Sequence, residues 1–318
     1  MSLPGPGVSE GIPSGAQLPP AKPTSGRKIA WARRVRAYKA SWKVFRRSPA
    51  GIWGLGILVL FILIALLGPI FVPYEQTLKT QATGPRLAAP SLEFPMGTDN
   101  SGRSVLALWV WGSRVSLTVG LTATVMTMLI GSIVGIAGAF FGRFLDTLLN
   151  AITNWFLVIP WIALAVAMAS VLGPSLFNII LVISIVSWGT AARLIRSQTL
   201  SVRNRNYVER ARALGASNWH IITRHILPNV FPIIFAQTIL MVSLAILSET
   251  TLSLIGLGDP SKPSWGGVLE AALNEGATTL GAWWWIWFPG LGITFTVLAF
   301  AMIGFALDEI INPKLRER

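Results

Sequence analysis

Residues 51–72 read GIWGLGILVLFILIALLGPIFV and contain no charged side chain. A helix needs about 20 apolar residues to cross a hydrocarbon core of about 30 Å, so this stretch is long enough to span a bilayer. The rest of the chain has a similar character, because 53% of its residues are hydrophobic and only 12% are charged. Soluble proteins carry about 25% charged residues. The composition therefore excludes a soluble enzyme and predicts an integral membrane protein.

Five further stretches have a comparable length and, apart from Glu249, no charge. The sequence predicts spans over about 51–72, 115–139, 151–172, 175–192, 231–256 and 283–307, with a hinge at Gly173-Pro174. A span surrounded by lipid must satisfy its own backbone hydrogen bonds, which a helix does within one segment. The expected fold is therefore an all-α membrane protein with six transmembrane helices.

The net charge of +13 is concentrated in a few segments between and beside the spans. Most of the 26 Lys and Arg residues lie in residues 1–50, the 193–230 loop and the C-terminus, and few lie in 73–114 and 257–282. Because cytosolic loops are enriched in Lys and Arg, both termini are expected in the cytosol. The charge is then a topology signal, and we expect no nucleic acid as a partner.

The predicted domains follow from these segments. Residues 1–26 are rich in Pro, Gly and Ser, which predicts a disordered cytosolic tail. Residues 27–50 are basic, contain aromatic residues and have no acid, as in an amphipathic helix that lies on anionic lipid. The transmembrane domain is expected over 51–309, and a cytosolic tail over 310–318.

Several kinds of chemistry are missing from the sequence. There is no cysteine, which excludes disulfides and thiolate metal sites. No Gly-x-x-x-x-Gly-Lys-Ser/Thr loop occurs, so the chain itself is not expected to bind and hydrolyse ATP. The two histidines, His220 and His225, are five residues apart, which turns them away from each other on an α-helix. We expect no catalytic site, cofactor or metal in this chain.

The cytosolic loop expected at 196–229 contains the most informative pattern. Its main part reads NYVERARALGASNWHIITRHILPN, residues 206–229. Gly215 can break a helix, Ser217 can cap the start of a second one, and Pro228 can stop it. A helix with small and acidic side chains suits a groove in another protein, although a solvated basic loop has a similar composition.

The spacing Glu209-x-Ala211-x-x-x-Gly215, followed by Leu227-Pro228, resembles the EAA loop of permease subunits of bacterial binding-protein-dependent ABC importers. Further blocks resemble the second, C-type, permease of the dipeptide, oligopeptide and nickel branch. These blocks are PMGTDNSGR at 95–103, GSRVSL at 112–117, ETTLSLIGLG at 249–258, PSWG at 263–266 and ALDEIINPKLR at 306–316.

The resemblance implies a type I ABC importer permease fold with a cytosolic coupling helix, in a bacterial cell membrane. The chain would form half of a translocation pathway for peptides, with nickel chelates or oligosaccharides as alternative substrates. The implied partners are a B-type permease in a heterodimer, two ATP-binding subunits that hold ATP and Mg, and an extracytoplasmic substrate-binding protein.

The resemblance also implies two sets of site residues. The set that would contact the ATPase is Tyr207, Glu209, Ala211, Arg212, Ala213, Leu214, Gly215, Ala216 and Ser217. The set on the side of the binding protein is Gly97, Thr98, Asp99, Gly102 and Arg103.

Glu249 is a separate candidate, because a carboxylate within an apolar span is costly and often functional. It could cap a structural element or pair with Arg103 or Arg114. It could instead couple protons in a stand-alone secondary transporter, which is the alternative class. Two packing features also leave alternatives open: Gly131 and Gly135 fit either one bundle or a dimer seam, and the WWWIW cluster at 283–287 fits an interfacial anchor or a substrate platform.

Overall fold

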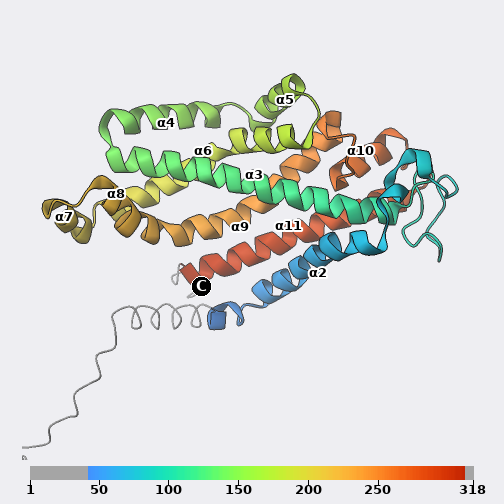
Figure 1. Ribbon diagram of the computed structural model, residues 1–318, viewed down its shortest axis with the longest axis horizontal. Coiled ribbons are helices and arrows are strands. Elements are labelled where there is room, and N and C mark those ends of the chain that lie inside the picture. The colour runs from blue at the N-terminus through green and yellow to red at the C-terminus, as the bar shows by residue number, and fades with distance from the viewer. Residues whose placement is uncertain (1–41, 312–318) are drawn as a thin grey trace, which may run out of the picture. The chain divides into compact units, whose positions relative to one another are not determined.

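The computed structural model describes residues 42–311, which form helices joined by short connections, apart from the long segment 72–104 between two of them (Figure 1). The described part contains no β-strand, only an isolated bridge between Thr98 and Ser104. The all-α fold is therefore confirmed. The predicted tail at 1–26, most of the basic segment at 27–50 and the end of the C-terminal tail lie outside the described residues.

Five long helices are apolar enough to cross a membrane. They are α2 (Pro49–Phe71), α3 (Val105–Phe141), α6 (Leu176–Arg203), α9 (Leu227–Leu252) and α11 (Trp283–Ile311). They correspond to five of the six predicted spans. α3 and α6 are longer than expected, because α3 starts ten residues earlier at the Ser104 cap and α6 continues past residue 192. On α6, Ile195, Thr199 and Val202 continue the buried face beyond the predicted end of the span.

The third predicted span, 151–172, is not one continuous helix. It is divided between α4 (Arg143–Val158) and α5 (Trp161–Leu172), whose axes bend by 89° at the break. Pro160 explains the bend, because proline has no N–H to donate and forces the residue before it away from helical geometry. Ile159 is extended, with φ −72° and ψ 129°. The bent pair counts as a sixth span only if both halves together cross the membrane.

α3 lies at the centre of the helices, packed closely against α6. A Cβ atom on Gly131 would lie 2.7 Å from Ala191 Cβ, and one on Gly135 would lie 2.7 Å from the carbonyl oxygen of Ala192. Only glycine allows the two backbones to come this close. The interpretation of these glycines as packing within one bundle is therefore confirmed.

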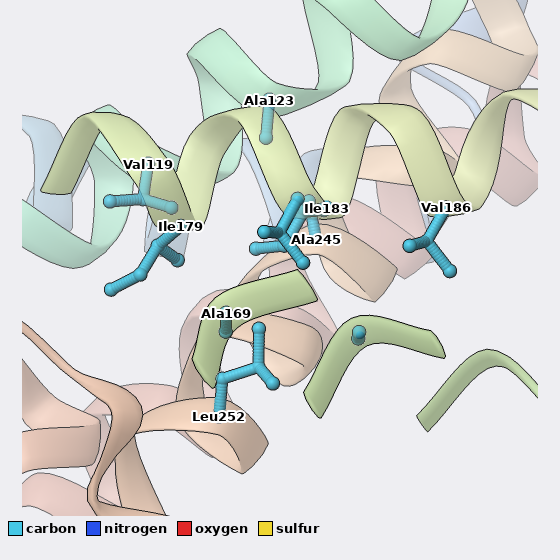
Figure 2. Close-up of a cluster of buried hydrophobic side chains, with 10 residues drawn as sticks. Val119, Ala123, Ala169, Ile179, Ile183, Val186, Ala245 and Leu252 are labelled. Carbon is cyan, nitrogen blue, oxygen red and sulfur yellow. The ribbon is translucent and has the colours of Figure 1, made fainter. Parts of the chain in front are cut away.

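The core near the α5 end of the helices is formed by Ala, Val, Ile and Leu side chains from four helices (Figure 2). Its buried members are Val119, Ala123, Ala165, Ala169, Ile179, Val182, Ile183, Val186, Ala245 and Leu252. α5 thus folds back onto α3, α6 and α9 instead of continuing the direction of α4.

The short elements gather at the two ends of the long helices (Figure 1). One end carries α7 (Asn206–Ala213), α8 (Asn218–Ile221) and the π-helix η3 (Ile222–Ile226). The other end carries the 3-10 helices η1 (Tyr74–Thr77) and η2 (Lys79–Gln81), the π-helix η4 (Ser253–Leu257) and α10 (Trp265–Asn274). Both sets of predicted site residues lie in these end regions.

Candidate functional site

The loop after α6 forms the predicted pair of short helices. Gly215 separates α7 from α8 with a φ of +80°, a conformation that glycine adopts without steric cost. The Ser217 hydroxyl then caps α8 by accepting a hydrogen bond from the N–H of His220 at 3.3 Å. The sequence therefore predicted both the break and the cap correctly.

One side of this loop is packed and the other is open. Val208, Ile221 and Ile226 are fully buried against the ends of the long helices, and Ala211 and Ala216 pack beside them. The other predicted coupling residues are exposed: Tyr207, Glu209, Arg212, Ala213, Leu214, Gly215 and Ser217.

The open side of the loop ends in two large apolar side chains. Leu214 is 88% exposed and Trp219 is 75% exposed. Apolar groups presented at the tip of an otherwise polar loop are typical of a contact with another protein. The predicted coupling residues included Leu214 but not Trp219. The position of Trp219 just after the Ser217 cap is the feature of the sequence that could have identified it.

The second short helix does not end at Pro228, contrary to expectation. α8 continues through η3 into α9, and Pro228 stands in the first turn of α9. The wider π turn, in which the N–H of Leu227 bonds to the carbonyl of Ile222, lets the chain accept a proline that donates no hydrogen bond. The loop is therefore joined to a transmembrane helix without a break.

The same π turn corrects the interpretation of the histidines. The rings of His220 and His225 lie 5.8 Å apart, centroid to centroid, and Tyr207 lies 5.9 Å from His225. On an α-helix the five-residue spacing would separate the two histidines, but a π turn places residues five apart on one side. Among the described residues, no group of three or more His, Asp or Glu side chains is positioned to hold a metal ion.

Charged side chains secure the helix ends beside this loop. Arg196 on α6 makes two hydrogen bonds to the carboxylate of Asp146 on α4, at 2.7 and 2.8 Å. Arg203 donates to the carbonyl of Ala139 on α3 at 2.7 Å. A bidentate Arg–carboxylate pair is among the stronger polar contacts in proteins. These contacts join α6 to α4 and α3 beside the point where the α7–α8 loop begins.

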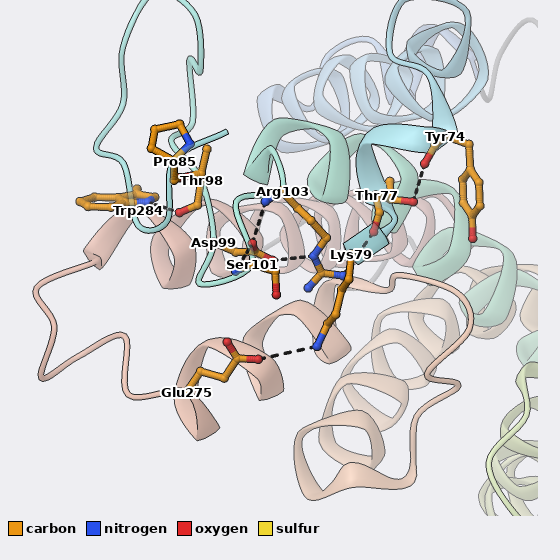
Figure 3. A network of polar contacts seen from close by, with 10 residues as sticks. All are labelled: Tyr74, Thr77, Lys79, Pro85, Thr98, Asp99, Ser101, Arg103, Glu275 and Trp284. Atoms are coloured by element: carbon orange, nitrogen blue, oxygen red, sulfur yellow. Dashed lines mark hydrogen bonds and ion pairs between the residues drawn. The ribbon is translucent and has the colours of Figure 1, made fainter. Parts of the chain in front are cut away.

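At the other end of the helices, Asp99 organises the outer loop (Figure 3). Its carboxylate accepts hydrogen bonds from the backbone N–H groups of Ser101 and Arg103, both at 2.8 Å, and from Arg103 Nε at 2.6 Å. Next to it, the carbonyl of Thr98 accepts a hydrogen bond from Trp284 Nε1 at 3.0 Å. The acidic residue thus closes the turn and directs the Arg103 side chain.

Four of the five predicted outer-loop residues are buried, namely Gly97, Thr98, Asp99 and Gly102. Both glycines have positive φ, and a Cβ atom on Gly102 would lie 2.2 Å from the carbonyl oxygen of Gly84. They therefore shape the loop, and Arg103 is the one member of this set with a partly open side chain.

The tryptophan cluster is divided between two environments. Trp284 and Trp285 are buried, and Trp284 supports the outer loop. Trp283 and Trp287 are exposed, as expected for side chains at a membrane interface. Sequence alone could not separate the supporting residues from the exposed ones.

Glu249 is 1% exposed and is held by hydroxyl groups. Ser253 Oγ donates to it at 2.8 Å and Ser116 Oγ at 3.2 Å. Ser116 Oγ in turn accepts a hydrogen bond from the N–H of Trp265, the first residue of α10, at 3.2 Å. This contact set, which we name the Glu249 node, joins α3, α9 and α10.

The expected ion pair of Glu249 is not formed. Arg103 binds Asp99, and the Arg114 guanidinium lies 6.0 Å from the centre of the Trp111 ring. The prediction of a pairing with Arg103 or Arg114 was therefore wrong, whereas the structural role agrees with the hydrogen bonds. Ser116 is 133 residues away in sequence, so no local pattern could have identified it.

A cavity of about 630 Å³ lies among the segments at this end of the helices. Residues from 74–79, the Gly173-Pro174 turn, the 253–264 segment and α10 contribute to its walls. Asp259 supports this arrangement by accepting hydrogen bonds from Ser261 and from the N–H of Leu176. Burial raises the pKa of Asp259, but these hydrogen bonds and the charge of Lys262 outweigh it and lower the pKa below its ordinary value.

Comparisons with known proteins agree with these features. The family described as "Binding-protein-dependent transport system inner membrane component" matches residues 104–317, and the "N-terminal TM domain of oligopeptide transport permease C" matches residues 38–90. A putative peptide transport system permease protein of Brucella suis is 36% identical over 81% of this chain and 87% of its own length. A dipeptide transport system permease protein of Alkalihalophilus pseudofirmus is 35% identical over 89% of this chain and 91% of its own.

A solved structure supports the fold independently. A chain of the inward-facing MetNI methionine ABC transporter superposes with a TM-score of 0.52 at 20% sequence identity, covering 64% of this chain and 94% of that one. This likeness confirms the fold expected from the sequence. Because the first family match covers more than half of the residues, the chain belongs to the family of binding-protein-dependent transport system inner membrane components.

Proposed function

We propose that this chain is a permease subunit of an ATP-driven importer and forms half of a translocation pathway for peptides. Dependence on a binding protein, which defines the family, implies a separate substrate-binding protein and ATPase subunits that use ATP. Relatives that are named peptide and dipeptide transport permeases support peptides as the substrate. Nickel chelates and oligosaccharides are the alternative substrates.

The observation that carries the proposal is the continuous connection from α8 through η3 to α9. The open side of the α7–α8 loop, with Leu214 and Trp219 at its tip, is the surface that would contact an ATPase. Movement of this loop would be transmitted directly to α9, because no flexible linker intervenes. A ligand or partner can shift the transporter between two states only by contacting them differently.

We further propose the composition of the complex. This chain would pair with a B-type permease in a heterodimer, above two ATP-binding subunits that hold ATP and Mg. Both termini would lie in the cytosol of a bacterial cell, with residues 51–309 as the transmembrane domain. The outer loop around Arg103 would face the binding protein.

The coupling contact can be tested with two substitutions in the assembled importer. Gly215→Pro should abolish ATP-driven uptake of a radiolabelled dipeptide, because proline cannot adopt the φ of +80° at this position. Glu209→Lys should do the same by reversing a charge on the exposed face of α7. Both variants should still insert into the membrane.

A matched control is Glu309→Lys, which reverses an exposed charge near the end of α11 and outside the 196–229 loop in sequence. It should keep wild-type uptake. Wild-type uptake in the Gly215 and Glu209 variants would contradict the coupling assignment. Uptake driven by an imposed proton gradient and lost in Glu249→Gln would favour the secondary-transporter alternative.

A further inference from the structure

The outer cavity has the size and the walls of a small-molecule site. Its volume of about 630 Å³ falls within the roughly 300–1,000 Å³ that is typical of ligand pockets. Its walls come from segments far apart in sequence, including η1, the 256–264 segment and one side of α10. The 256–264 segment is joined to α6 by the bond from the Leu176 N–H to Asp259, and to η1 by the bond from the Tyr74 hydroxyl to the Ser261 carbonyl, both at 3.1 Å.

Cationic side chains line this cavity, and one of them is held rigidly. The Arg103 side chain is 15% exposed and is fixed by Asp99 and by the carbonyl of Thr77, which bonds to Nη1 at 3.3 Å. A guanidinium carries five N–H donors, so three are left without a partner among the described residues. Lys79 and Lys262 line the same cavity, and Lys79 Nζ also lies 3.9 Å from a carboxylate oxygen of Glu275, at an exposed position (Figure 3). Such a group of donors suits a carboxylate.

Anionic side chains line the cavity too, and only one of them is available. Asp259 is already engaged by Ser261 and Leu176. Glu270 on α10 uses one carboxylate oxygen to accept a hydrogen bond from Asn274 at 2.6 Å, while the other has no partner in the described part of the chain. This free oxygen can accept a hydrogen bond from an ammonium group.

We propose that the outer cavity binds a free short peptide in its zwitterionic form. The peptide carboxylate contacts Arg103 and Lys79, with Lys262 beside them, and the terminal ammonium contacts Glu270. The identification of the ligand as a peptide rests on the proposed function. The expectation that the ligand carries both a carboxylate and an ammonium group rests on the side chains of the cavity.

The volume and the mixed charge favour a free peptide over one inserted acidic side chain of a partner protein. A single carboxylate would use the cationic groups and leave Glu270 without a counterpart. The floor of the cavity includes Ser253 and Ser264, and Ser253 is the hydroxyl that holds Glu249. A bound peptide would therefore rest on the outer end of α9, the helix whose inner end carries the α7–α8 loop.

The test uses the full importer complex in lipid nanodiscs, without the binding protein and without ATP. Equilibrium dialysis with radiolabelled dialanine should give saturable binding. N-acetyl-dialanine lacks the ammonium and dialanine amide lacks the carboxylate, and each should compete at least about tenfold more weakly, as expected for a lost hydrogen bond to a charged group.

Substitutions then assign each charge to its partner. In Glu270→Gln the free and the acetylated peptide should compete equally, because the ammonium has no anionic partner. In the double variant Lys79→Met with Lys262→Met, the difference in competing strength between dialanine amide and free dialanine should be smaller than in the wild type. The controls are Glu93→Gln and Arg86→Met, outer charges that do not line the cavity, and both should behave as wild type.

The outcomes separate this inference from the proposed function. Absence of saturable dipeptide binding, with ATP-driven uptake intact, overturns the cavity site and leaves the importer function standing. Equal competition by all three peptides in the wild type also overturns it. Charge-dependent binding in a complex that imports no peptide supports the cavity site and contradicts the proposed function.

Discussion

Glu249 holds three helices together through hydroxyl groups and not through a cation. A buried carboxylate is costly unless hydrogen bonds replace its lost hydration. Ser253 and Ser116 supply such bonds, and Ser116 passes the connection on to the backbone of α10. A single acidic residue therefore fixes the position of α10, which forms one wall of the outer cavity.

The Glu249 node predicts a loss of stability when its centre is removed. Glu249→Ala should destabilise the protein by about 2–3 kcal/mol, because two buried hydroxyls lose their acceptor. The measurement is the thermal midpoint of the solubilised complex. Ser248→Ala is the control, since that hydroxyl bonds only to the Leu244 carbonyl within its own helix, and its midpoint should stay close to wild type. Equal midpoints for the two variants would contradict the role of the node.

At the scale of single elements, the important feature is the π-helix η3 between α8 and α9. It accommodates Pro228 without ending the helix and brings His220 next to His225. π turns inside α-helices are often found at functional positions. Here the π turn sets the rotation of the α7–α8 loop relative to α9, and so determines which side chains face outward.

Cross-linking should detect this π turn directly, because the chain has no cysteine of its own. The double variant His220→Cys with His225→Cys should form a disulfide under mild oxidation. Asn206→Cys with Ala211→Cys has the same spacing on the α-helix α7, where positions five apart are about 140° apart around the axis, and should not. Absence of a disulfide in both pairs would show that residues 222–226 are α-helical.

At the scale of the whole molecule, the two end regions of the long helices differ in structure. The end with η1 and α10 contains a cavity between segments distant in sequence, and the other end contains the α7–α8 loop with exposed apolar side chains. α9 connects the two, since it runs from η3 to η4. This arrangement suits a subunit that receives a ligand on one side of a membrane and a mechanical input on the other.

Orientation in the membrane can be tested by labelling single cysteines in intact cells. Leu92→Cys, in a fully exposed position of the outer loop, should react with a membrane-impermeant maleimide. Leu214→Cys should react only after the cells are opened, because the excess of Lys and Arg predicts that the α7–α8 loop lies in the cytosol. The reverse pattern of labelling would contradict the predicted topology.

Much of the fold followed from the sequence because its causes are local. Five of the six spans predicted from apolar runs are long helices in the structure, since a segment in lipid must form its own hydrogen bonds. Gly215 and Ser217 were identified because a break and a cap depend on nearby backbone. Glu249 was identified because one charge in an apolar run is conspicuous by composition alone.

The tertiary structure decided what depends on contacts between distant segments. The sequence could not show that Ser116 holds Glu249, that Trp284 supports the outer loop, or that the 73–103 segment and α10 enclose a cavity. At Pro160 the sequence predicted a continuous helix where the structure has a break, and at Pro228 it predicted a stop where a π turn lets the helix continue. The sequence around each proline is compatible with either outcome. Composition and local chemistry thus determine which segments are helices, whereas packing between distant segments determines which polar groups meet.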